Sequence, residues 1–182
     1  SREATSPPSA SLADNEREVG LMLPGYDPVG SAGDCTMDAD SAQKAVDFFP
    51  LFLRHYQGKW SGESYVLADW QASVVANLFG WMRPDGTRRY RTALVEVPRK
   101  SGKSHLCAGL ALYSLLFDSE PGAEVYCAAA DREQASIVFG IAKRFVEADE
   151  FLRSRCRIYR TAITVEETAS TMKPLSSDSR TA

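Results

Sequence analysis

Apolar residues recur at regular intervals along the chain, and these intervals predict where helices and strands form. Between residues 40 and 56 they recur every three or four positions, which is the spacing of one face of a helix. Pro50 lies inside this run, and we expect it to break or kink the helix. A second helix is predicted over residues 69–78, ending near Gly80.

The centre of the chain predicts a buried strand followed by a buried helix. Residues 90–97 form the predicted strand, because Leu94, Val95 and Val97 are typical of a parallel sheet with both faces covered. Residues 105–117 are apolar almost all round, which indicates a helix covered by other elements. This run is shorter than the roughly 20 apolar residues that a membrane span needs.

A second strand and helix follow, and together these elements define the fold class. Residues 123–129 predict a strand, and Asp131 is predicted to cap the next helix, with Gln134 completing a capping box. Short β segments are expected within residues 156–165. Strand, loop, helix, strand and helix in this order make a βαβ unit, which implies a parallel sheet with a right-handed crossover. The predicted fold class is therefore α/β.

The first part of the chain differs in composition from the rest. Residues 1–38 are rich in Ser, Pro, Ala, Gly and acidic groups, so they bury little apolar surface and are expected to form a flexible arm. Residues 39–182 are expected to form the structured domain. The chain does not begin with Met and stops in a polar stretch, so we expect it to be a fragment of a longer protein.

Composition narrows the function classes. The 182 residues suffice for one domain with a core, and the formal net charge of −3 means that any contact with DNA must be local. There is no secretory leader pattern, and neither the four cysteines nor the two histidines have zinc-ligand spacing. Cys107 and Cys127 lie in apolar runs and are interpreted as small core residues, which fits a reducing cytoplasm.

The segment between the predicted strand and the buried helix carries the candidate chemistry. Residues 98–104 read Pro-Arg-Lys-Ser-Gly-Lys-Ser, and a strand, a tight loop ending in Gly-Lys-Ser and a helix together hold nucleotide triphosphates. Lys103 would reach the β- and γ-phosphates, and the Ser104 hydroxyl would bind Mg²⁺. The usual motif has a glycine where this chain has Val97. The alternative is a basic surface turn, but basic residues clustered at a strand–helix junction favour the phosphate loop.

Several segments together resemble the large terminase subunit of tailed bacteriophages, the ATPase that pumps viral DNA into a procapsid. The resemblance spans the chain from about Leu21 to its end. Terminases are similar to this chain in having a loop of the form Pro-Arg-Lys-x-Gly-Lys-Ser, so the glycine missing at Val97 fits the family. The resemblance implies a P-loop NTPase with a mainly parallel sheet flanked by helices. It depends on segments in a fixed order: residues 67–71, 78–81, 95–104, 128–135 and 173–179.

The resemblance also implies roles for individual residues. Arg99 matches the loop arginine near the γ-phosphate, where it could stabilise developing charge, although a solvated loop charge is an equal alternative. Gln71 matches a glutamine that reads adenine, with an ordinary helix-surface glutamine as the alternative. Lys103 and Arg99 are the implied catalytic residues. The implied nucleotide site comprises Gln71, Pro98, Arg99, Lys100, Ser101, Gly102, Lys103 and Ser104, with ATP and Mg²⁺ as cofactors.

At the level of function, the resemblance implies a motor that couples ATP hydrolysis to movement of double-stranded DNA into the procapsid. The expected setting is the host cytoplasm during assembly of a phage or prophage. The implied partners are the portal protein, the small terminase subunit and further copies in a ring, with no membrane. The family's Walker B carboxylates and nuclease domain are absent from this chain, so we expect little turnover from it alone. A helicase, a small-molecule kinase and a non-hydrolysing docking module remain alternatives.

Overall fold

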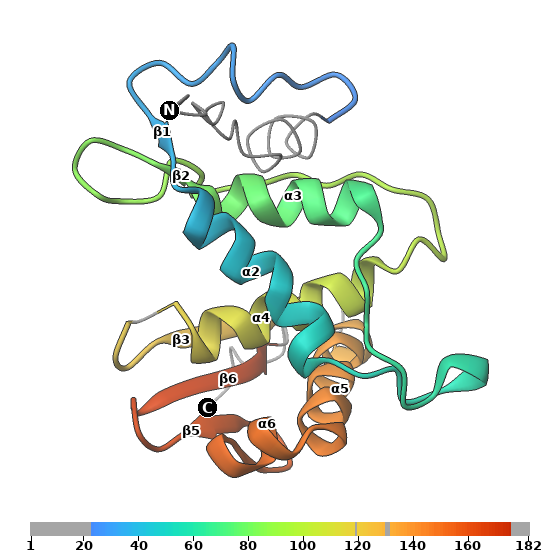
Figure 1. Ribbon diagram of the computed structural model, residues 1–182. Coiled ribbons are helices and arrows are strands. Elements are labelled where there is room, and N and C mark those ends of the chain that lie inside the picture. Colours follow the sequence, from blue (N-terminus) through green and yellow to red (C-terminus); the bar gives the residue numbers. More distant parts are fainter. Residues whose placement is uncertain (1–22, 119, 130–131, 176–182) are drawn as a thin grey trace, which may run out of the picture. The chain divides into compact units, whose positions relative to one another are not determined.

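The computed structural model describes residues 23–118, 120–129 and 132–175, and the chain divides into two compact units (Figure 1). The first unit takes its described residues from 1–43 and 68–91, and the second from 44–67 and 92–182. The described elements, in chain order, are β1 (Thr36–Met37), α2 (Ala39–Phe52), the short 3-10 helix η1 (Gly58–Trp60), α3 (Asp69–Gly80), β2 (Trp81–Met82), α4 (Lys103–Leu116), β3 (Glu124–Ala128), α5 (Arg132–Ala148), α6 (Glu150–Arg155), β4 (Arg157–Ile158), β5 (Ile163–Val165) and β6 (Ser170–Leu175).

The first unit is built on α3 and a two-stranded antiparallel sheet. Met37 of β1 pairs with Trp81 of β2, directly after the end of α3. The predicted helix over residues 69–78 is confirmed, and it continues to Gly80 as expected. A β-carbon at Gly80 would lie 2.5 Å from the sulfur of Met37 and 2.7 Å from the β-carbon of Ala42. The last position of this helix is therefore a glycine because a side chain there would clash with Met37 and Ala42.

Part of the predicted N-terminal arm is described, and it forms turns held by specific hydrogen bonds. The carboxylate of Asp27 accepts hydrogen bonds from the backbone N–H groups of Val29 (3.0 Å) and Gly30 (2.8 Å). The guanidinium of Arg89 donates to the carbonyl oxygen of Pro28 (2.8 Å) and lies 5.2 Å from the centre of the Trp81 ring. These contacts tie residues 23–38 to β2 within the first unit, while residues 1–22 lie outside the described part.

The second unit contains a four-stranded sheet in the order β3-β6-β5-β4. Strands β3 and β6 are parallel, with Glu124 opposite Thr171, whereas β6 pairs antiparallel with β5 and β5 with β4. Helices α4 and α5 contact each other and both of the parallel strands (Figure 1). The predicted strand at residues 123–129 and the short β segments within 156–165 are confirmed. The α/β class is confirmed too, and the described sheet is mixed.

Strand β6 was not predicted from the sequence. It contains Pro174, which lacks the N–H that a central strand normally donates. The antiparallel pairing with β5 extends only from Ser170 to Met172 on the β6 side, so Pro174 lies beyond the region where β6 is paired on both edges. Pro174 is therefore tolerated in β6, although a proline in the sequence normally indicates that no central strand forms.

Two expectations need correction, one about Pro50 and one about two cysteines. Pro50 does not break helix α2, which continues to Phe52; Pro50 lies in its last turn, where it removes a single N–H donor. Cys107 is exposed and Cys127 is half-buried, because α4 buries one side while Cys107 lies on the other, and β3 alternates between exposed and half-buried positions. The predicted cap Asp131 lies outside the described residues.

Across the described ranges, the helices are all too short or too polar to cross a membrane.

The predicted strand at residues 90–97 does not form. The segment before the basic loop pairs with no described strand, and its apolar side chains face solvent: Leu94 is 86% exposed and Val95 is 40% exposed. An apolar pattern shows that side chains suit burial, but a strand also needs a neighbour for its backbone. The described part of the chain provides no such neighbour for this segment.

Candidate functional site

The loop before α4 is bent at two positions with left-handed backbone. Lys100 has a φ of 66° and Gly102 has a φ of 82°. Glycine adopts this conformation freely, whereas for a lysine it costs about 1 kcal/mol. Strain of this kind at a residue other than glycine is concentrated at functional sites. The loop geometry therefore supports the functional interpretation of residues 98–104.

The loop leads directly into the start of α4. The Ser101 hydroxyl donates to the carbonyl oxygen of Pro98 (2.8 Å), which closes the turn, and the N–H of Leu106 donates to the carbonyl oxygen of Gly102 (3.0 Å). Gly102 is the N-cap residue and has no side chain with which to cap the first backbone N–H groups. Those groups carry the positive end of the helix dipole, and anions bind at such positions.

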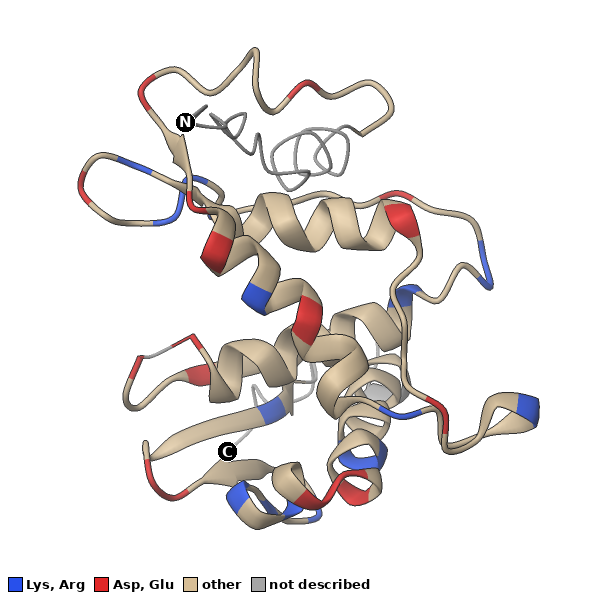
Figure 2. Cartoon of the chain, viewed as in Figure 1, with Lys and Arg blue, Asp and Glu red and all other residues tan. Residues whose placement is uncertain are grey.

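The structure brings the predicted loop residues together at this helix start. The side chains of Arg99, Lys100 and Lys103 are exposed, and Ser104 is half-buried. Figure 2 shows the basic residues in blue in the loop and at the start of α4. Three cations in solvent suit the oxygens of a triphosphate, and a serine hydroxyl suits Mg²⁺, which prefers oxygen ligands. The residues present therefore fit ATP and Mg²⁺.

Gln71 lies in the other compact unit and has a structural partner there. It is in the first turn of α3, is 5% exposed, and its side-chain oxygen accepts a hydrogen bond from the N–H of Ala68 (3.0 Å). This contact satisfies one of the backbone donors at the start of α3. The adenine-reading role of Gln71 remains a prediction.

Sequence reasoning missed a group of aromatic rings behind the start of α4. His105 directly follows Ser104, and its imidazole contacts the rings of Tyr56, Tyr65 and Phe145. These four residues come from α4, from α5 and from the segment between α2 and α3. No local periodicity joins positions so far apart, so the sequence carries no signal for this group.

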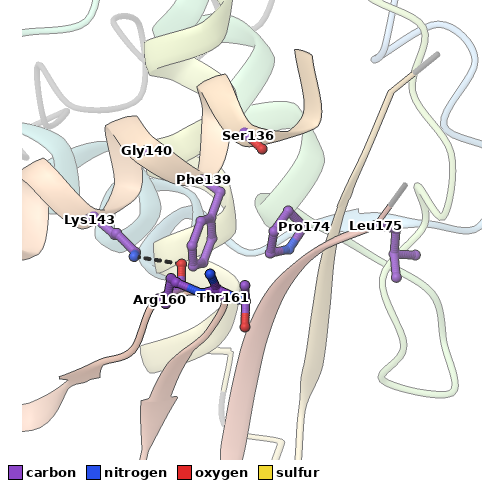
Figure 3. Close-up of a pocket in the computed structure, with 8 residues that line it drawn as sticks. All are labelled: Ser136, Phe139, Gly140, Lys143, Arg160, Thr161, Pro174 and Leu175. Carbon is purple, nitrogen blue, oxygen red and sulfur yellow. Dashed lines mark hydrogen bonds between the residues drawn. The ribbon is translucent and has the colours of Figure 1, made fainter. Parts of the chain in front are cut away.

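A pocket of about 310 Å³ lies in the same unit, between α5, the turn before β5 and the end of β6 (Figure 3). The ammonium of Lys143 donates to the carbonyl oxygen of Arg160 (2.9 Å) and lies 4.9 Å from the centre of the Phe139 ring. Sequence reasoning missed this site as well, because its residues meet only in the fold. The lining residues are Ser136, Phe139, Gly140, Lys143, Arg160, Thr161, Pro174 and Leu175.

Comparisons with known proteins agree with this geometry. Residues 69–182 match the family described as the terminase large subunit, ATPase domain. A search of curated proteins finds no match. Among solved structures, the fold is similar to the crystal structure of the HK97 bacteriophage large terminase, with a TM-score of 0.65 and 22% sequence identity. The similarity covers 81% of this chain but 29% of the HK97 chain, and at this identity it concerns the fold alone.

The family match extends over more than half of the chain. It includes α3, the strained basic loop and α4, which are the elements that carry the predicted site. The chain therefore belongs to the family of terminase large subunits, and it matches their ATPase domain.

Proposed function

We propose that this chain is the ATP-binding part of a phage DNA-packaging motor. The observation that carries the proposal is the basic loop with left-handed Lys100 and Gly102 at the uncapped start of α4. This loop lies inside the region that matches the terminase ATPase domain. The residue types, the strain and the helix dipole all favour a bound polyphosphate.

Each loop residue has a distinct part in this proposal. Lys103 binds the β- and γ-phosphate oxygens, and Ser104 binds the magnesium ion. Arg99 lies in the loop with its side chain in solvent, so it is free to turn toward the γ-phosphate and stabilise charge that develops there. Mg²⁺ would supply charge neutralisation on the phosphate oxygens. Gln71 would read the adenine edge, which requires its amide to be available to the base.

In the complete protein, hydrolysis would drive translocation of double-stranded DNA into the procapsid. The chain spans 29% of the length of the related HK97 chain, so the whole motor needs parts beyond those described here. We propose that this chain alone binds ATP with little turnover. Its partners would be the portal protein, the small terminase subunit and further copies in a ring, in the host cytoplasm.

The pocket beside α5 is the place where we propose that DNA contacts this chain. Lys143 and Arg160 line it, together with the hydroxyl groups of Ser136 and Thr161. Because the chain as a whole has a net charge of −3, phosphate contacts depend on local cations of this kind. These cations and hydroxyls suit the oxygens of a nucleic-acid backbone, whereas Phe139, Pro174 and Leu175 form the apolar part of the lining.

The central test is calorimetric titration of ATP with Mg²⁺ into the wild-type chain and into Lys103→Ala. Loss of one charge-assisted contact should weaken binding by roughly ten- to a hundredfold. Lys59→Ala is the matched control, because Lys59 is an exposed lysine of η1 outside the loop. A folded wild-type chain that does not bind ATP, or a Lys103→Ala variant that binds as tightly as wild type, would contradict the proposal.

A further inference from the structure

His105 is enclosed by aromatic rings at the point where α4 begins. Its imidazole stacks on Tyr56, with ring centres 5.8 Å apart and planes at 21°, and on Tyr65, at 6.1 Å and 12°. The ring of Phe145 meets it edge-on, with centres 6.0 Å apart. Contacts of this geometry are favourable beyond simple burial. Because Ser104 is the preceding residue, this group of rings is joined to the proposed phosphate site by one peptide bond.

The rings that hold His105 are themselves fixed. Phe145 of α5 is fully buried. The segment carrying Tyr56 and Tyr65 is closed by backbone hydrogen bonds: the N–H of Tyr65 donates to the carbonyl of Leu53 (2.9 Å), and the N–H of His55 donates to that of Glu63 (2.9 Å). His105 is therefore held by elements that have their own stabilising contacts within this unit.

The start of α4 has few other ways to stay ordered. Helix ends fray, and the N-cap residue Gly102 has no side chain to prevent this. Lys103 is exposed and Ser104 is half-buried, so the fixed contacts of the first turn begin with His105 and Leu106. The contacts of His105 reach to a separate segment and to α5, which ties the first turn to two other elements.

The charged and titratable groups around His105 disfavour a second positive charge. The guanidinium of Arg144 on α5 lies 5.1 Å from the centre of the Tyr56 ring, and His55 lies 5.0 Å from that of Tyr65. Lys103 is on the same turn of α4 as His105. Burial, and secondarily the charge of His55, lower the pKa of His105 below its usual value, and burial raises the pKa of Tyr56. Besides these ring contacts, Nε2 of His105 lies 3.4 Å from the Tyr56 hydroxyl, within hydrogen-bonding distance.

We propose that His105 is a positioning residue for the nucleotide site: its ring, held between Tyr56 and Tyr65, fixes the first turn of α4 so that Lys103 and Ser104 face the phosphates. This inference rests on the proposed function. Removal of this ring would loosen the first turn of α4 and lower the affinity for the nucleotide.

The test titrates a non-hydrolysable ATP analogue with Mg²⁺ into the wild-type protein and its variants at neutral pH. His105→Ala should weaken binding about tenfold, which is the size expected from losing two ring contacts. His105→Phe should restore most of this affinity, because phenylalanine keeps the ring contacts and loses only the hydrogen bond between the Tyr56 hydroxyl and Nε2 of His105 (3.4 Å). Circular dichroism confirms that the variants are folded.

Two results would overturn the inference. One is full affinity in His105→Ala while Lys103→Ala loses binding, which would leave the proposed function standing. The other is a folded His105→Phe variant that binds at least tenfold more weakly than wild type, and this result decides the question even if His105→Ala does not fold. Failure of the wild-type protein to bind the analogue would overturn the proposed function together with the inference.

Discussion

Gly109 of α4 lies so close to Phe49 of α2 that a β-carbon at position 109 would overlap the phenyl ring. Phe49 is fully buried, as is Leu53, which lies next to the same point. The ring therefore has no space into which it could move. This close approach fixes α4, the helix that begins at the candidate phosphate loop, against the second half of α2.

Overpacking a core usually costs about 1–3 kcal/mol, and the better helix propensity of alanine offsets about 1 kcal/mol of this. Gly109→Ala is therefore expected to lower the free energy of unfolding by up to about 2 kcal/mol. Gly140→Ala is the control, because a β-carbon at Gly140 of α5 has no neighbouring atom within 4 Å. Urea unfolding should show the two substitutions moving stability in opposite directions, and equal effects would contradict the described packing.

The left-handed backbone at Lys100 leads to a second prediction. Glycine tolerates a φ of 66°, whereas a β-branched residue does not. Lys100→Gly should be more stable than Lys100→Val by about 1–2 kcal/mol, after the greater freedom of glycine in the unfolded chain is counted. Thermal unfolding of the two variants measures this difference. Equal stability would mean that the loop does not adopt this backbone conformation in solution.

Asp38 caps the start of α2, and this contact makes stability depend on pH. Its carboxylate accepts from the Ser41 hydroxyl (2.7 Å) and from the backbone N–H groups of Asp40 and Ser41 (both 3.1 Å). These hydrogen bonds hold the pKa of Asp38 below its usual value of 3.8. The Ser41 hydroxyl is the main cause, and the two backbone N–H groups are a further cause. The folded state therefore favours the ionised form, so this stabilisation is complete above about pH 3.8 and is lost as the pH falls through the lowered pKa.

Substitution of Asp38 tests this cap. Asp38→Ala should cost about 1 kcal/mol at neutral pH, whereas Asp38→Asn, which also caps helices, should cost less. In addition, Asp38→Asn should lack the part of the acid destabilisation that this carboxylate causes. Denaturant titrations at neutral and acid pH give both quantities, and identical pH profiles for wild type and Asp38→Asn would count against the predicted role.

The pocket beside α5 leads to a prediction about DNA. Each phosphate contact that is lost reduces the slope of log affinity against log salt by about 0.9 for duplex DNA. Lys143→Glu and Arg160→Glu should each weaken duplex binding and reduce the slope by about this amount. Lys59→Glu changes the net charge equally at a lysine of η1 that does not line the pocket. If all three variants lose affinity by the same factor, net charge rather than the pocket explains the effect.

The sequence predicted best what depends on near neighbours in the chain. The amphipathic spacing around residues 40–56 and 69–78 is local, and helices form at both places. Residues 98–104 were predicted to be a phosphate loop from their residue types, their position before a helix and the terminase resemblance, and this role remains a prediction. The sequence wrongly predicted a strand at residues 90–97, because apolar character does not show whether a partner strand is present. The stacking of Tyr56 on His105 joins positions 49 residues apart, which no short-range pattern reveals.

The uncovered segment before the phosphate loop has a consequence for how the protein behaves in concentrated solution. A segment that pairs with no described strand and has an almost fully exposed Leu94 is a template for pairing between molecules. Light scattering by the purified chain should therefore rise steeply with concentration, and Leu94→Lys should shift this rise to higher concentration. Association between copies of this chain is therefore expected to involve residues 92–97, which lie immediately before the candidate phosphate loop.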